Sequence, residues 1–158
     1  MSTKADYTDD EWAALRRAPL VAGMAISLAD PGGPIELTHE TLAALKAMSN
    51  PGSDLPLLVA VSQDAMAMSQ QRQNPMGDFK PKGALAGQEI LDEIRRVNGI
   101  LEAKATPEEA APFREWLLQA AQAAADAAKE GGFMGFHAVR VSQGEQAMLE
   151  QLRKALGA

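Results

Sequence analysis

The sequence contains no cysteine among its 158 residues, which excludes disulfides, thiolate metal sites and a cysteine nucleophile. Nothing in this composition points to an oxidising compartment. Residues 1–12 are polar and acidic, whereas an export signal needs a basic start followed by an apolar stretch. We therefore expect a cytoplasmic protein of bacterial type.

Long hydrophobic runs are also missing. The longest largely apolar stretch, residues 18–29, is interrupted by Pro19, Gly23 and Ser27. At about a dozen residues it is too short to cross a bilayer core of about 30 Å. We expect no membrane contact and predict a buried helix in this stretch.

Positive charge is scarce as well. The chain has 15 Lys and Arg against 21 Asp and Glu, a formal net charge of −6 at pH 7. Affinity for nucleic acid rests mainly on neutralising phosphates with Lys and Arg, so we expect no nucleic-acid partner. The acidic balance leaves room for a basic protein partner or for a cation.

Aromatic residues make up only 4% of the chain, whereas alanine contributes about thirty positions. We expect a core of small and aliphatic side chains in which helices approach one another closely. The length suits a single domain, residues 1–158.

Helix starts are well marked. Thr8–Glu11, Thr106–Glu109 and Ser142–Glu145 have capping-box spacing, in which the hydroxyl and the glutamate each bind a backbone N–H at the helix start. Pro107 suits a first helical position because its missing donor costs nothing there. Thr38 is a plausible cap for a further helix.

The apolar spacing predicts the remaining helices and leaves two details open. Pro19 either interrupts the first helix or restarts a second one. Residues 57–61 could be a short strand, but we prefer a helix because no other segment would pair with it. Leu42 is expected on the core face of its helix, and Leu85 in the core stripe of the long helix that follows residues 69–83.

Residues 69–83 are polar, carry prolines and glycines and lack periodicity, which predicts a mobile surface loop. Met66, Met68 and Met76 near this loop either fill the core or line an adaptable binding groove. Together these patterns predict an all-α fold, a compact bundle of about six helices built from αα-hairpins with Gly-rich corners.

The two ends of the chain look alike in outline. Each has a helix, a Gly-Gly loop, two alternating aliphatic residues and a capped helix, which is a possible internal repeat. In the second loop Gly131 or Gly132 can close the helix, with Phe133 and Phe136 folding back on it. Alternatively Phe133, Phe136 and His137 form an interaction site.

Two stretches, "AISLADPGGPIELTHETLAAL" and, more loosely, "AAKEGGFMGFHAVRVSQGEQAMLEQL", resemble the tellurite-resistance TerB-like helical family. In that family such loops lie between helices of a compact all-α domain, and their acidic residues bind divalent cations. The resemblance implies this role for Asp30, Glu40, Glu130 and Glu145. The "DEW" opening and the "KEGGF" ending also look like a set of small uncharacterised bacterial helical proteins.

The densest cluster of hard and borderline metal ligands is Asp30, Glu36, His39 and Glu40. An oxygen-rich set of this kind suits Ca²⁺, Mg²⁺ or Mn²⁺. The alternative is that these are solvated acidic residues favoured by the dipole at a helix N-terminus. Beyond such a divalent cation, no cofactor is expected.

Catalytic motifs are not evident, since the chain has no nucleophile elbow, no HExxH and no phosphate loop. We expect a non-enzymatic interaction module that acts through a protein partner or its own homodimer. The alanine face of residues 114–130 could pack on such a partner, although burial in its own bundle is the simpler explanation. The alternatives are a TerB-like divalent-cation-binding stress protein and a small enzyme using the loop around His137.

Overall fold

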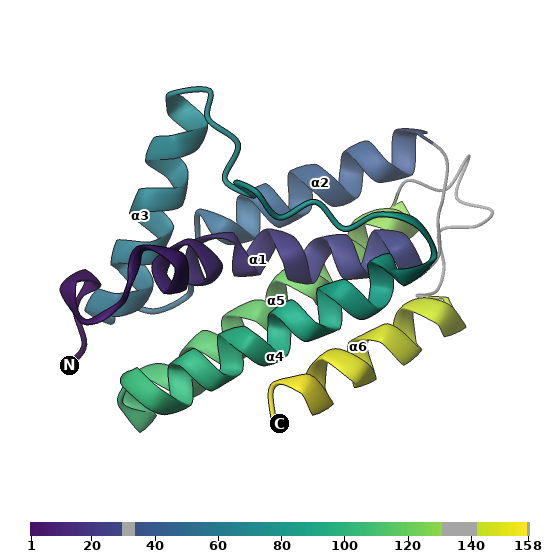
Figure 1. Cartoon of the computed structure of the whole chain (residues 1–158). Helices are drawn as coiled ribbons and strands as arrows, with labels where there is room; N and C mark the ends of the chain where they lie inside the picture. Colours follow the sequence, from purple (N-terminus) through teal and green to yellow (C-terminus); the bar gives the residue numbers. More distant parts are fainter. Residues whose placement is uncertain (30–33, 131–141, 158) are drawn as a thin grey trace.

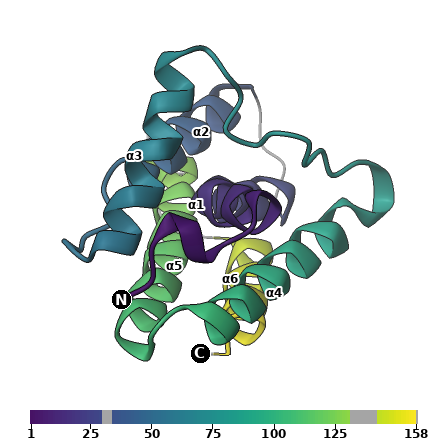
Figure 2. The same cartoon turned by 60° about the vertical axis from the view of Figure 1, so that its left-hand side comes forward.

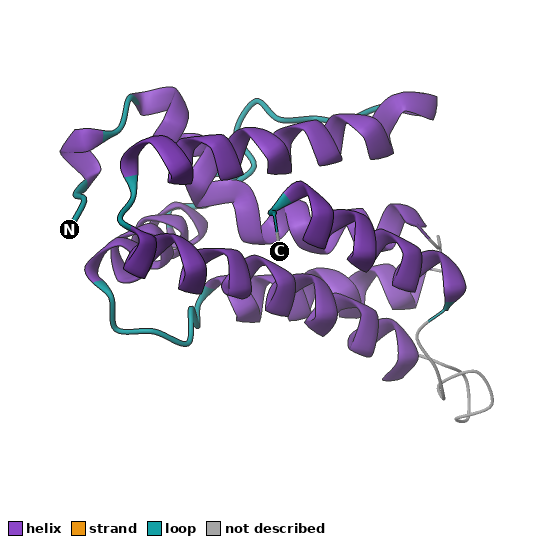
Figure 3. Cartoon of the chain, turned by 90° about the horizontal axis from the view of Figure 1, so that it is seen from below, coloured by secondary structure: helices purple, strands orange, loops and turns teal. Residues whose placement is uncertain are grey.

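A computed structural model describes the backbone of residues 1–29, 34–130 and 142–157, and the side chains of all of these except 34–38 and 128–130. The structure is 78% helical, and the described residues contain no strand. The predicted all-α bundle is thus confirmed (Figures 1 and 3). Its α-helices are α1 (Asp9–Ala29), α2 (Pro34–Met48), α3 (Pro56–Gln70), α4 (Ala86–Lys104), α5 (Pro107–Glu130) and α6 (Gln143–Ala155).

Helix α1 is the centre of the bundle. It packs against each of the five other α-helices, most extensively against α5 and α4. In Figure 1 it runs between α2 on one side and α4 and α6 on the other. None of the described helices is long and apolar enough to span a membrane.

The three predicted helix starts are confirmed by their hydrogen bonds. The Thr8 hydroxyl accepts from the Glu11 N–H at 3.1 Å, and Glu11 accepts from the Thr8 N–H at 2.8 Å. Thr106 and Glu109 make the same reciprocal pair. The Ser142 hydroxyl accepts from the Glu145 N–H at 3.2 Å, in a cap for α6. Each of these helix starts depends on hydrogen bonds between residues within four positions of one another, so a short sequence motif is enough to predict it.

Pro19 does not interrupt α1, which continues through it as a single 21-residue helix. Proline inside a helix removes a hydrogen bond and usually costs about 3 kcal/mol. Here Pro19 is buried, so the packing of the central helix outweighs that local cost. Residues 57–61 are helical, as predicted.

The predicted cap at Thr38 is wrong. Helix α2 already begins at Pro34, which suits the first helical position because it needs no donor there. Ile35 and Leu37 therefore lie inside the helix and not in a linker before it. The first half of the possible repeat therefore lacks the predicted linker with two aliphatic residues before a capped helix. The Gly-Gly loop of the second half lies outside the described residues.

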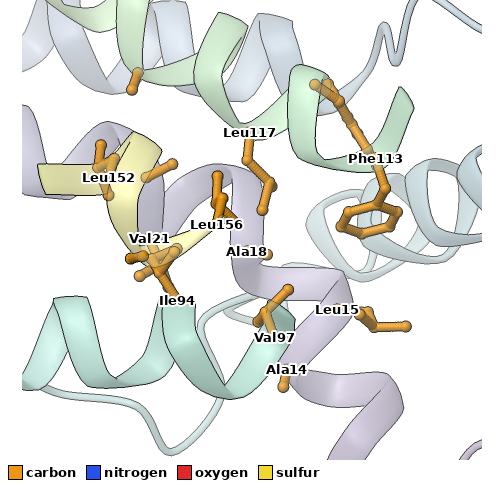
Figure 4. Close-up of a cluster of buried hydrophobic side chains, with 14 of the residues drawn as sticks. Ala14, Leu15, Ala18, Val21, Ile94, Val97, Phe113, Leu117, Leu152 and Leu156 are labelled. Carbon is orange, nitrogen blue, oxygen red and sulfur yellow. The ribbon is translucent and has the colours of Figure 1, made fainter. Parts of the chain in front are cut away.

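The main core lies where α1, α4, α5 and α6 meet (Figure 4). Alanines such as Ala14 and Ala18 on α1 allow larger side chains of the neighbouring helices to come close, including Val97 and Leu117. Leu85 was expected in this core but is 68% exposed. It ends a short 3₁₀ turn, residues 83–85, that precedes the first turn of α4, so it does not share the helical face of the core stripe.

Residues 71–82, here called the strap, carry the chain from the end of α3 to the start of α4 (Figure 2). They lie within the predicted loop at 69–83. Met76 of the strap is buried and belongs to the main core, whereas the polar residues around it are exposed. The Asn74 side chain accepts from the Met76 N–H at 3.0 Å, and Gly77 takes a left-handed φ of 60°.

Several buried polar contacts join segments that are distant in the sequence. Arg17 of α1 and Glu93 of α4 form an ion pair at 2.7 Å, with only 11% and 8% of their side chains exposed. The fully buried Glu109 accepts from the N–H and the hydroxyl of Ser2. Buried charge is stable only when paired and hydrogen-bonded, so these contacts fix how the helices are arranged.

Candidate functional site

Among the hollows on the surface of the described residues, two are lined by side chains of α2, one on each of two faces of the helix. The first lies between α2 and α5, has a volume of about 610 Å³ and is called the α2–α5 groove. Its lining residues are His39, Leu42, Ala43, Lys46, Ala47, Asn50, Gln119, Ala123, Asp126 and Ala127.

Alanines make up four of the ten residues that line the groove. Helices α2 and α5 run antiparallel and make the most extensive helix pair of the bundle. The Trp116 indole N–H donates to the Ala47 carbonyl at 2.7 Å and fixes one end of the pair. Ala43, Ala47 and Ala123 leave the groove low enough for another helix to lie in it.

One large apolar side chain stands in this groove. Leu42 was expected on the core face of α2 but is 60% exposed, whereas Met48 is fully buried. Residues spaced by three turn about 60° around a helix at each step, so a face that buries Met48 leaves Leu42 outside. An exposed leucine beside a stripe of alanines makes a contiguous apolar surface.

The two edges of the groove carry opposite charges. Lys46 lies on the α2 edge, where His39 also lines the groove, and Asp126 lies on the α5 edge. Both Lys46 and Asp126 are exposed. Asp126 accepts a hydrogen bond from the Gln122 amide at 3.1 Å, which holds the carboxylate along the helix.

The second hollow, called the strap pocket, lies where α1, α2 and the strap meet, with a volume of about 250 Å³. Its walls are mainly apolar, and Met76 and Pro75 of the strap cover one side. The lining residues are Leu20, Gly23, Met24, Ser27, Glu40, Thr41, Ala44, Leu45, Asn74, Pro75 and Met76. It shares no lining residue with the α2–α5 groove.

Glu40 is the acidic residue in the lining of the strap pocket. Its side chain is only 3% exposed and accepts a hydrogen bond from the Ser27 hydroxyl of α1. A carboxylate in mainly apolar surroundings is held by such bonds. The sequence identified Glu40 as a candidate ligand, but gave no sign that it would face an apolar pocket.

The residues of the expected cation site are only partly described. His39 is exposed and lines the α2–α5 groove, whereas Glu40 faces the strap pocket. The side chains of Asp30 and Glu36 lie outside the described residues. Within the described part of the chain, no group of three or more His, Asp or Glu side chains is placed to hold a metal ion. A site formed by all four residues stays a prediction.

The other candidate residues lie mainly in the second Gly-Gly loop. Phe133, Phe136 and His137 fall outside the described residues, as does the side chain of Glu130. Glu145, which the TerB resemblance singled out, is buried in the first turn of α6.

Sequence reasoning missed Leu42, Lys46 and Asp126 as members of one surface. The alanine-rich face of α5 was the available signal, since it indicated a partner helix. It could not reveal that this partner would be α2, or which flank of the pair would stay open. That depends on the antiparallel packing of two helices about 70 residues apart in the sequence, as in the contact from Trp116 to Ala47.

The fold therefore defines an all-α bundle with two unlike hollows on either side of α2. No family model matches the chain, and neither a curated protein nor a solved structure matches it significantly.

Proposed function

We propose that the protein is an interaction module that forms a homodimer through the α2–α5 groove. The observation that carries the proposal is the groove itself, which is lined by an exposed Leu42 and several alanines and has a basic edge and an acidic edge. Apolar surface with polar borders is typical of protein interfaces.

The distribution of charge favours a second copy of the chain as the occupant. Closed dimers are mostly two-fold symmetric, so each copy presents the same surface to the other. A two-fold axis running along the groove would place α2 of one copy over α5 of the other. The Lys46 edge would then face the Asp126 edge twice, once on each side of the axis.

The alanines of the groove allow the helices of two copies to pack closely in such a dimer. Small side chains on α2 and α5 let the backbones of two helix pairs come near each other, so that Leu42 of each copy becomes covered. Ion pairs at the rim would set orientation and specificity more than affinity.

Charge reversal at the groove edges tests this arrangement. We expect wild-type protein to show a concentration-dependent mass in sedimentation equilibrium, approaching that of two chains. Lys46→Asp alone and Asp126→Lys alone would each place like charges opposite each other on both sides of the axis and weaken the dimer about tenfold or more. The double variant restores both pairs and should dimerise again.

Leu42→Glu and Leu85→Glu make a matched pair for the apolar part of the interface. Both leucines are exposed, at 60% and 68%, but only Leu42 lies in the groove. Leu42→Glu should give a monomer, and Leu85→Glu should leave the mass unchanged. A wild-type protein that stays monomeric at all concentrations, or a dimer insensitive to Leu42→Glu, would refute the proposal.

A further inference from the structure

The strap pocket is a second site, on a different face of α2 from the proposed dimer surface. We propose that it binds a small organic cation, a primary amine with an aliphatic or aromatic body, whose ammonium group binds Glu40. This inference goes beyond the proposed function and does not depend on it, because the two hollows share no lining residue.

The pocket has the size of a small ligand. An apolar cavity of roughly 150 Å³ is enough for a benzene-sized molecule, and the strap pocket has about 250 Å³. It therefore has room for a ring or a short alkyl chain with a polar arm. Leu20, Met24 and Leu45 contribute apolar side chains to its lining.

The polar end of the pocket selects the charge of the ligand. An ionised carboxylate only accepts hydrogen bonds, and it accepts several at once. A ligand ammonium group can therefore add to the interactions that Glu40 already makes, among them the bond from the Ser27 hydroxyl, and its charge-assisted bond is strengthened by the apolar surroundings. A carboxylate ligand would be repelled there, and an alcohol would gain only a weaker bond.

The methionines suit the body of such a ligand. Met24 of α1 and Met76 of the strap both line the pocket. Thioether side chains adapt to the shape of a ligand and make favourable contacts with aromatic rings. The strap holds Met76 in place through the Asn74 turn, so the pocket is already shaped before a ligand arrives.

The probes for the test are benzylamine, benzyl alcohol and benzoate, which share a ring and differ in charge. Binding is followed by NMR on protein with ¹³C-labelled methionine methyl groups. We expect benzylamine to shift the Met24 and Met76 signals while leaving Met148 of α6 unchanged. Benzylamine should bind at least about tenfold more tightly than benzyl alcohol, and benzoate should not bind.

Two variants separate the carboxylate from the cavity. Glu40→Gln should abolish the preference for benzylamine over benzyl alcohol, whereas Ser27→Ala, which keeps the carboxylate, should retain it. Leu45→Phe fills the pocket and should weaken both ligands. If Glu40→Gln fails to fold, Leu45→Phe still tests whether both ligands bind in this pocket.

Equal affinity for benzylamine and benzyl alcohol would overturn the proposal. So would unchanged benzylamine binding in folded Glu40→Gln or in Leu45→Phe, or the absence of shifts at Met24 and Met76. Dimerisation is measured separately on the same variants, so that failure of one proposal is not taken for failure of the other.

Discussion

Asp64 of α3 concentrates contacts from the N-terminal part of the chain. The Trp12 indole donates to its carboxylate at 2.8 Å, and Lys4 and Arg16 form ion pairs with it at 3.2 and 3.5 Å. Burial alone would raise the pKa of Asp64. The hydrogen bonds from Trp12 and Lys4 and the charges of Lys4 and Arg16 together bring its pKa below the ordinary value of 3.8.

A lowered pKa in the folded state means that the ionised carboxylate stabilises the fold. This stabilisation is fully present above pH 3.8, the ordinary pKa, and is lost as the pH falls through the lower pKa of the folded state. Asp64→Asn keeps an acceptor for Trp12 but removes the charge, so we expect a loss of roughly 1 kcal/mol near neutral pH. In urea unfolding, the difference from wild type should shrink on acidification.

The control for this effect is Asp92→Asn, which removes an exposed carboxylate whose partners among the described residues are Arg95 and the Gln88 amide, both on α4. We expect a change within about 0.5 kcal/mol at any pH. A difference between Asp64→Asn and wild type that stays constant to acidic pH would show that charge is not what Asp64 contributes.

At the scale of the helices, the close approach of α1 and α2 depends on Gly23. A Cβ atom at this position would lie 2.7 Å from the Cβ of Ala44, nearer than side-chain atoms tolerate. Gly99 lies on the exposed side of α4, where a Cβ atom added to the glycine would have no neighbour within 4 Å.

We expect Gly23→Ala to destabilise the protein by about 1–3 kcal/mol, because α1 and α2 must move apart. Gly99→Ala should stabilise it by about 0.5–1 kcal/mol through helix propensity alone. Thermal and urea unfolding of the two variants measure both effects. A neutral or stabilising Gly23→Ala would mean that the two helices are not held at this distance.

The helices also show what the sequence could predict. The starts of α1, α5 and α6 follow from hydrogen bonds within four residues, so Thr8, Thr106 and Ser142 were found correctly. The start of α2 was not found, because both Pro34 and Thr38 are acceptable locally and the sequence does not rank them. The exposure of Leu42 and the pocket beside Glu40 depend on which helices pack together, which no local pattern records.

In the whole molecule, α1 and α5 each contact all five other described α-helices, and α1 also packs extensively against α4. If any other described helix detached from the bundle, part of the apolar surface of α1 would become exposed to solvent. Trp12 of α1 and Trp116 of α5 are both buried, at 3% and 1% exposure, and report on different sides of this core.

We therefore expect unfolding in one cooperative transition. Trp116→Phe leaves Trp12 as the single fluorescent reporter, and Trp12→Phe leaves Trp116. Each variant loses an indole hydrogen bond and about 1 kcal/mol of stability. Within each variant, the fluorescence and far-UV circular dichroism midpoints should coincide. An earlier fluorescence transition in either variant would show that part of the bundle unfolds separately.

The central place of α1 has a consequence for biosynthesis. Helix α1 leaves the ribosome well before its most extensive partner, α5, which begins at Pro107. The contact from Ser2 to Glu109 likewise closes a separation of 107 residues. Until α4 and then α5 have emerged, only α2 and α3 can cover the apolar face of α1, and during this interval the nascent chain depends most on chaperones.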